Sequence, residues 1–136
     1  MVPSFRARRD LGVVAVTFLL GILLYPGPLL RGEIFFERDL HLDWYPRLEA
    51  LSRFLQEGAW PLWDTSIGFG QPLLADPGAQ VAYPVTWLVL AVPRSAAYTV
   101  FVLVHLIVGA LGMSRLAGRL GAGRLGAPVA AVLFVL

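Results

Sequence analysis

The chain has 136 residues, carries a formal net charge of +2 and is 57% hydrophobic, with a mean hydropathy of +0.71. Its apolar residues form long uninterrupted runs, which a soluble domain of this size would not carry, so the composition predicts a membrane protein. The absence of cysteine excludes a disulfide framework and a thiolate metal site. No nucleic acid partner is expected, because the arginines are divided among the ends of the apolar runs and form no single basic face.

Two apolar runs predict transmembrane helices. Residues 11–30 contain no charge, and a helix of that length rises about 30 Å, the thickness of the hydrocarbon core of a bilayer. Residues 96–113 form the second predicted span, and residues 126–136 begin a third, truncated one, as expected for the N-terminal portion of a longer protein. A cleaved signal peptide is the alternative for the first run, but Tyr25-Pro26-Gly27-Pro28 follows it in place of a small-residue cleavage site.

The arginines predict the orientation of these spans. Arginines precede the first span and follow the second, whereas acids outnumber arginines between the two. Short Arg-rich flanks mark the cytoplasmic side of a membrane. The sequence therefore predicts a cytoplasmic basic N-terminus at residues 1–10, an extracytoplasmic loop at residues 31–95 and a cytoplasmic turn at residues 114–125.

Two segments of the predicted loop have helical character. Residues 46–57 carry an apolar stripe, for which we expect an amphipathic helix lying on the outer leaflet. The stripe comprises Leu48, Leu51, Phe54 and Leu55. On the other side of this helix, Glu49 and Arg53 are spaced as an i,i+4 ion pair. Residues 81–92 are apolar but too short to span a bilayer, so they predict an interfacial or re-entrant helix.

The second predicted span contains three residues that bear on packing. Gly109 and Gly112 predict a close approach to another helix. His105 lies in the middle of the span, where a polar group needs a partner, and we expect it to hydrogen-bond a neighbouring helix.

The loop also contains short motifs in a fixed order. These are Arg38-Asp39, Tyr45-Pro46, Pro61-Leu62-Trp63-Asp64, Gly70-Gln71-Pro72-Leu73-Leu74-Ala75-Asp76-Pro77 and Tyr83-Pro84. Followed by an apolar span with the letters LVH and GALGM, this pattern resembles the start of the YfhO family of bacterial multi-spanning membrane proteins. The resemblance covers the chain from about Phe35 to its C-terminus.

The resemblance implies a fold, a location and a function. The fold is all-α and polytopic, with this chain as the N-terminal fragment of a glycosyltransferase-C-like protein of the bacterial cytoplasmic membrane, N-terminus inside. The implied function is transfer of a sugar from a polyprenyl-phosphate carrier to a cell-envelope glycopolymer acceptor on the outer face of the lipid bilayer. The alternative is a non-catalytic polytopic protein, either a transporter or flippase or a structural subunit. Transport would favour ionisable residues within the spans, and the second span offers only His105.

Four residues are candidates for the site. Asp39 is the first catalytic candidate, because a carboxylate just outside the membrane can accept a proton from an acceptor hydroxyl or help to hold a divalent cation. The resemblance places Asp39 on the acid that this architecture carries in its first outer loop. Asp43 is the second, since two nearby carboxylates can divide the roles of base and metal ligand. Arg38 can bind a phosphate through its forked guanidinium, and Trp63 can stack on a sugar ring. The need for a metal is left open.

Asp39 and Trp63 also have interpretations in which they serve only the structure. Asp39 can be a solvated loop acid or an ion-pair partner of Arg38, and Trp63 can anchor the loop at the level of the lipid headgroups. Asp64 and Asp76 follow turn-forming motifs, and we expect their side chains to cap those turns.

Overall fold

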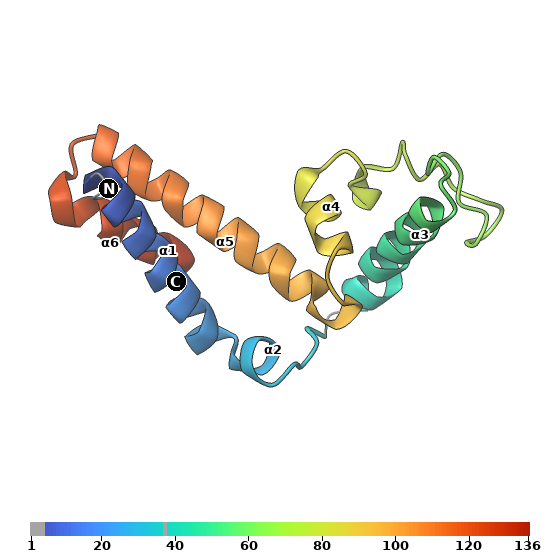
Figure 1. Ribbon diagram of the computed structural model, residues 1–136, viewed down its shortest axis with the longest axis horizontal. Helices are drawn as coiled ribbons and strands as arrows, with labels where there is room; N and C mark the ends of the chain where they lie inside the picture. Colours follow the sequence, from blue (N-terminus) through green and yellow to red (C-terminus); the bar gives the residue numbers. More distant parts are fainter. Residues whose placement is uncertain (1–4, 37) are drawn as a thin grey trace. The chain divides into compact units, whose positions relative to one another are not determined.

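The computed structural model describes residues 5–36 and 38–136, and every regular element in that part of the chain is helical. The order is α1 (Phe5–Leu24), α2 (Pro26–Leu30), η1 (Leu40–Trp44), α3 (Tyr45–Gln56), η2 (Pro77–Ala79), α4 (Pro84–Leu90), α5 (Arg94–Arg119) and α6 (Gly123–Val135) (Figure 1). The predicted all-α class is therefore confirmed for the described residues. The chain forms two compact units, a helical unit (Met1–Glu33 with Thr99–Leu136) and a loop unit (Ile34–Tyr98).

The first predicted span, residues 11–30, is not one continuous helix. α1 ends at Leu24 and α2 begins at Pro26, because a proline has no N–H for the helical ladder and its ring clashes with the preceding turn. By length and composition, α5 is the one helix within the described ranges that is long and apolar enough to cross a membrane. It contains the second predicted span, and the shorter apolar helix α6 covers most of residues 126–136.

Small and medium-sized side chains form the core of the helical unit. The buried residues are Val13 from α1, Ala110 from α5, and Ala131 and Val135 from α6, with Leu20 and Leu111 packed against them. The turn between α5 and α6 contains Gly121 and Gly123, both at positive φ (86° and 68°), a conformation that glycine adopts without strain. Three helices thus share one core in this unit.

The two glycines singled out in α5 differ in their surroundings. A Cβ built on Gly109 would collide with the ring of Phe134 in α6, whereas nothing lies within 4 Å of a Cβ built on Gly112. The predicted close packing is therefore confirmed at Gly109 and wrong at Gly112. His105 Nδ1 lies 2.6 Å from the carbonyl oxygen of Phe101, so the polar ring has a partner within α5 itself.

Replacement of Gly109 by leucine is expected to weaken the contact between α5 and α6. The new side chain must displace the Phe134 ring, and overpacking of this kind typically costs about 1–3 kcal/mol. The midpoint of thermal unfolding in detergent should fall for Gly109→Leu and stay unchanged or rise for Gly112→Leu, the matched control with open space. Equal midpoints for the two variants would show that the Gly109–Phe134 contact carries no stability.

The loop unit has a hydrophobic core of its own. Ala50 and Leu51 of α3 are buried against Leu73, Ala79 and Val81, and Leu51 is completely inaccessible to solvent. The expectation that the apolar stripe of residues 46–57 lies on the outer leaflet is therefore wrong for its central residue. The segment that follows α3 folds back over Leu51 and covers it with protein, while Leu55 of the same stripe stays exposed.

Local signals explain where α3 begins and ends. Pro46 lies in its first turn, directly after a preceding helical turn, and Gly58 follows its last turn at a φ of 66°. The amide of Gly58 donates to the carbonyl of Leu55 (3.1 Å), and the amide of Ala59 to that of Phe54 (2.9 Å). α4 similarly begins at Pro84 and ends at Leu90, slightly inside the predicted segment 81–92.

Candidate functional site

Arg38 and Asp39 lie at the start of an irregular helical turn. They precede η1, a single π-helical turn that leads directly into α3 and in which the amide of Tyr45 donates to the carbonyl of Leu40. Leu40 is buried, while the side chains of Arg38 and Asp39 are exposed. Single π-turns within helices occur frequently at functional sites. Asp39 has no ion pair with another described residue, so its carboxylate is available to a ligand.

A row of aromatic rings runs alongside this turn. Neighbouring ring centroids lie 5.0–5.5 Å apart in the order Phe36, His41, Tyr45, Trp44, Tyr98 and Phe35. His41 is exposed, and its ring lies between those of Phe36 and Tyr45. Burial, together with the neighbouring Tyr98, raises the pKa of Tyr45, so its hydroxyl stays protonated at neutral pH. All of these rings except that of Tyr98 belong to residues on either side of Arg38 and Asp39, so the row lies next to this pair along the chain.

Asp43, the second catalytic candidate, is held by Arg47. The Arg47 guanidinium pairs with the Asp43 carboxylate one turn earlier, and its Nε lies 2.7 Å from Oδ2 of Asp76. Asp76 also accepts a hydrogen bond from the amide of Gly78 (2.8 Å), so the predicted turn cap is confirmed. A Cβ on Gly78 would lie 2.9 Å from Nη1 of Arg47, which shows how closely the guanidinium packs on this turn. Arg47 thus ties the π-turn to the turn at Asp76.

Asp64 is the most deeply buried carboxylate among the described residues of the loop unit. Its side chain is 4% exposed, and Oδ1 accepts hydrogen bonds from the amide of Ser66 (3.0 Å) and from Nη2 of Arg53 (2.9 Å). The turn cap expected here is confirmed, but the partner of Arg53 is not the predicted one. Glu49, which lies four residues before Arg53, instead accepts from Nε of Arg94 (2.8 Å).

The backbone of Asp64 is held as well. It exchanges two hydrogen bonds with Gln71, at 2.7 and 2.8 Å, and so closes the loop between these residues. Burial alone would raise the pKa of Asp64, but the hydrogen bonds from Ser66 and the charge of Arg53 together bring that pKa below its ordinary value. The carboxylate is therefore an ionised structural group.

Trp63, the candidate for sugar stacking, packs on Gly70. A Cβ on Gly70 would collide with the indole ring, and Gly70 has a φ of 98°, so two constraints favour glycine there. The Trp63 ring remains half-exposed. Trp60 and Trp87 line an apolar groove of about 270 Å³ together with Leu55, and Trp87 is oriented by a hydrogen bond from its Nε1 to the carbonyl of Val81 (2.8 Å).

The four candidate site residues thus differ in their surroundings. Asp39 and Arg38 stand exposed at the π-turn, Asp43 is engaged by Arg47, and Trp63 belongs to the Asp64–Gln71 loop. Sequence reasoning missed Arg47, although its i,i+4 spacing from Asp43 is the signal that would have found it. Within residues 5–36 and 38–136, no group of three or more His, Asp or Glu side chains is placed to hold a metal ion.

Comparisons of this chain with protein-family models, with curated proteins and with solved structures found no match.

Proposed function

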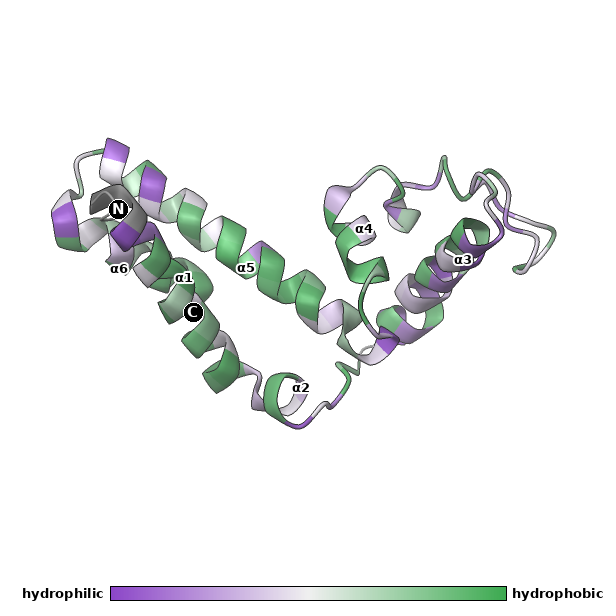
Figure 2. Ribbon diagram, in the orientation of Figure 1, coloured by the Kyte–Doolittle hydropathy of each residue, from purple (hydrophilic) through white to green (hydrophobic). Residues whose placement is uncertain are grey.

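We propose that the helical unit is embedded in a bacterial cytoplasmic membrane, as part of a polytopic protein. The support comes from its outer surface, where large apolar side chains are exposed on α1 and α6; Leu11, Leu23 and Leu133 are 67–70% exposed. Figure 2 shows the lengths of α1 and α5 as mostly hydrophobic, with hydrophilic residues where α5 turns toward α6. Large contiguous apolar surfaces of this kind are characteristic of contact with lipid or protein.

The arginines support the orientation with the N-terminus inside. Nη2 of Arg115, near the end of α5, donates to Oδ2 of Asp10 in α1 (2.8 Å), so both basic segments lie at the same end of the helical unit. The positive-inside rule then assigns this end to the cytoplasm.

The function that the site supports best is sugar transfer from a polyprenyl-phosphate carrier to a cell-envelope acceptor on the outer face, as the motif resemblance implies. In this proposal Asp39 accepts the proton of an acceptor hydroxyl, whose oxygen attacks the anomeric carbon of the sugar. The bond between that carbon and the phosphate oxygen breaks, and the phosphate leaves with the electron pair. Arg38 binds the departing phosphate, whose oxygens match its forked guanidinium.

One observation carries this assignment. Among the aspartates of the loop unit, Asp43, Asp64 and Asp76 are held in ion pairs, whereas Asp39 is exposed and is adjacent to a cationic side chain. The transporter alternative has less support. α5 carries no Asp, Glu, Arg or Lys between Thr99 and Ser114, and His105 is hydrogen-bonded within its own helix.

The proposal is tested without knowing the sugar, because polyprenyl phosphate is released whichever sugar is transferred. Membranes containing the full-length protein should form polyprenyl phosphate from the sugar-loaded carrier, and this formation should depend on an added cell-envelope acceptor. Carrier turnover that is the same with and without the protein would contradict sugar transfer and favour the structural-subunit alternative.

A further inference from the structure

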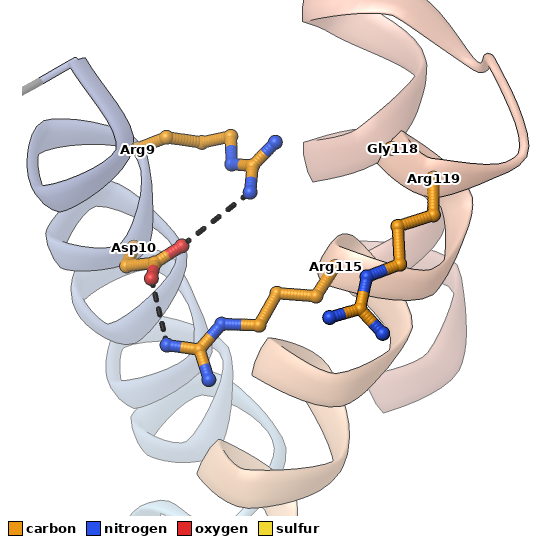
Figure 3. Close-up of a pocket in the computed structure, with 5 residues that line it drawn as sticks. All are labelled: Arg9, Asp10, Arg115, Gly118 and Arg119. Atoms are coloured by element: carbon orange, nitrogen blue, oxygen red, sulfur yellow. Dashed lines mark hydrogen bonds and ion pairs between the residues drawn. The ribbon is translucent and has the colours of Figure 1, made fainter.

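A basic pocket lies at the arginine-rich end of the helical unit. Its volume is about 430 Å³, and it is lined by Arg9 and Asp10 of α1 and by Arg115, Gly118 and Arg119 of α5. Figure 3 shows Arg9 and Arg115 directed at Asp10 from opposite sides, with Arg119 beside Arg115. Three guanidinium groups and one carboxylate line the pocket, so it has a net formal charge of +2 and suits an anion with more than one negative charge or several acceptor oxygens.

The ion pairs of the pocket leave donors unused. Asp10 accepts from Arg115 at 2.8 Å and lies 3.7 Å from Nη2 of Arg9, which positions both guanidinium groups. Nε of Arg9 is nevertheless buried without a hydrogen-bond partner, and Arg119 has no acidic partner among the residues that the structure describes. Buried donors are normally satisfied, so Nε of Arg9 is available to an oxygen atom of a ligand, and the exposed guanidinium of Arg119 adds a second positive charge at the pocket.

Gly118 keeps the floor of the pocket open. A Cβ at this position would lie 3.1 Å from Nη1 of Arg9, closer than most side chains approach one another. Glycine at this position therefore lets the Arg9 guanidinium lie close to the backbone of α5.

An apolar groove lies next to the basic pocket and shares Arg9 with it. The groove has a volume of about 270 Å³ and runs between α1 and α6, lined by Gly12, Val16, Pro128 and Val132 among others. Arg9 lines both the groove and the basic pocket. A charged pocket and an apolar groove on the two sides of one arginine match a molecule with an anionic head and a hydrocarbon tail.

We infer that this pocket binds the phosphate of an anionic phospholipid, with one acyl chain of that lipid in the groove between α1 and α6. The inference rests on the proposed membrane location and does not depend on sugar transfer, which is assigned to the loop unit. The phosphate contacts Arg9, Arg115 and Arg119, and Asp10 holds two of these guanidinium groups in place. The lipid acts as a structural ligand at the cytoplasmic end of the helices.

The charge of the pocket is tested with two arginine variants. The full chain is placed in phosphatidylcholine nanodiscs, phosphatidylglycerol with the same acyl chains is titrated in, and native mass spectrometry measures the retained lipid. Arg119→Gln should lower retention of phosphatidylglycerol about tenfold, the loss expected when one charge-assisted hydrogen bond is removed. Arg124→Gln removes the same charge at the same end but outside the pocket lining, and should change retention less than twofold.

The groove is tested with two glycine variants. Gly12 lines the groove, Gly112 does not, and both have open space around an added Cβ. Gly12→Leu should therefore fill the groove and lower phosphatidylglycerol retention severalfold, whereas Gly112→Leu should not, with helicity checked by circular dichroism for both. Titration with inorganic phosphate separates a headgroup from a free anion, because Gly12→Leu should leave phosphate binding unchanged.

Two outcomes would overturn the inference. Equal losses for Arg119→Gln and Arg124→Gln would show general attraction of anionic lipid to a basic surface, with no pocket. A strong effect of Arg119→Gln on inorganic phosphate, combined with no effect of Gly12→Leu on phosphatidylglycerol, would assign the pocket to a free anion and reject the lipid.

Discussion

Replacement of Asp39 by asparagine should reduce polyprenyl phosphate release by about 10²- to 10⁴-fold, the usual cost of losing a general base. Asparagine keeps the shape of the side chain but cannot accept the acceptor proton. Asp39 is exposed at the π-turn, so the change removes no internal contact among the described residues, and expression and membrane insertion should be unaffected. The measurement is carrier turnover in membranes that contain equal amounts of full-length wild-type and variant protein.

Two further variants test whether the loss of turnover is specific to Asp39. Glu57→Gln removes another exposed acid of the loop unit and should leave turnover normal. Asp43→Asn breaks the pair with Arg47 and should reduce turnover less than Asp39→Asn does, by loosening the π-turn. Normal turnover in Asp39→Asn would mean that Asp39 is only a solvated loop acid. A larger loss in Asp43→Asn would assign the base to Asp43.

The second large effect is structural and concerns Asp64. Asp64→Asn should destabilise the loop between Asp64 and Gln71 by about 1–3 kcal/mol, because a charged hydrogen bond from Arg53 to a buried carboxylate is lost. Hydrogen exchange should speed up at the amides of Ser66 and Gln71, which donate to the side chain and the backbone carbonyl of Asp64. Asp76→Asn changes a turn cap that is more exposed, and its effect should be smaller. Unchanged hydrogen-exchange protection of these amides in Asp64→Asn would show that the ion pair between Arg53 and Asp64 does not stabilise the loop.

The ion pair between Arg53 and Asp64 also predicts that the stability of this loop depends on pH. The folded-state pKa of Asp64 is lowered, so its ionised form stabilises the loop at every pH above the unfolded-state pKa, at about 4. This stabilisation should disappear as the pH falls through the lower folded-state value. The amide of Ser66 should therefore lose protection against hydrogen exchange below about pH 4, after correction for the intrinsic pH dependence of exchange. The Asp64→Asn variant should show no such pH-dependent loss.

Local signals predicted the helices of this chain well. Pro46 and Gly58 bound α3, Pro84 begins α4, and the two turn-capping aspartates lie where their motifs indicate. These features depend on residues within one or two turns of each other, which a sequence displays directly. Pro26 is another such local signal: a proline is expected to end or kink a helix, and α1 ends at Leu24, two residues before it.

The long-range pairings could not be predicted in the same way. Arg53 had an acid at helical spacing, Glu49, yet it pairs with Asp64, and Glu49 pairs with Arg94. The choice depends on how the residues after α3 fold back to bury Leu51, a tertiary effect that no local pattern contains. The exposed position of Asp39 likewise depends on the π-turn, which no sequence signal marked.

The location of the loop unit is the claim on which the proposed function depends, and the cysteine-free chain allows it to be measured directly. Single cysteines at an exposed position of each unit, Glu57→Cys and Leu120→Cys, are treated in intact cells with a membrane-impermeant maleimide. The account predicts that Glu57→Cys is labelled in intact cells and that Leu120→Cys is labelled only after the membrane is permeabilised. Labelling of both positions in intact cells, of neither, or of Leu120→Cys alone would contradict it.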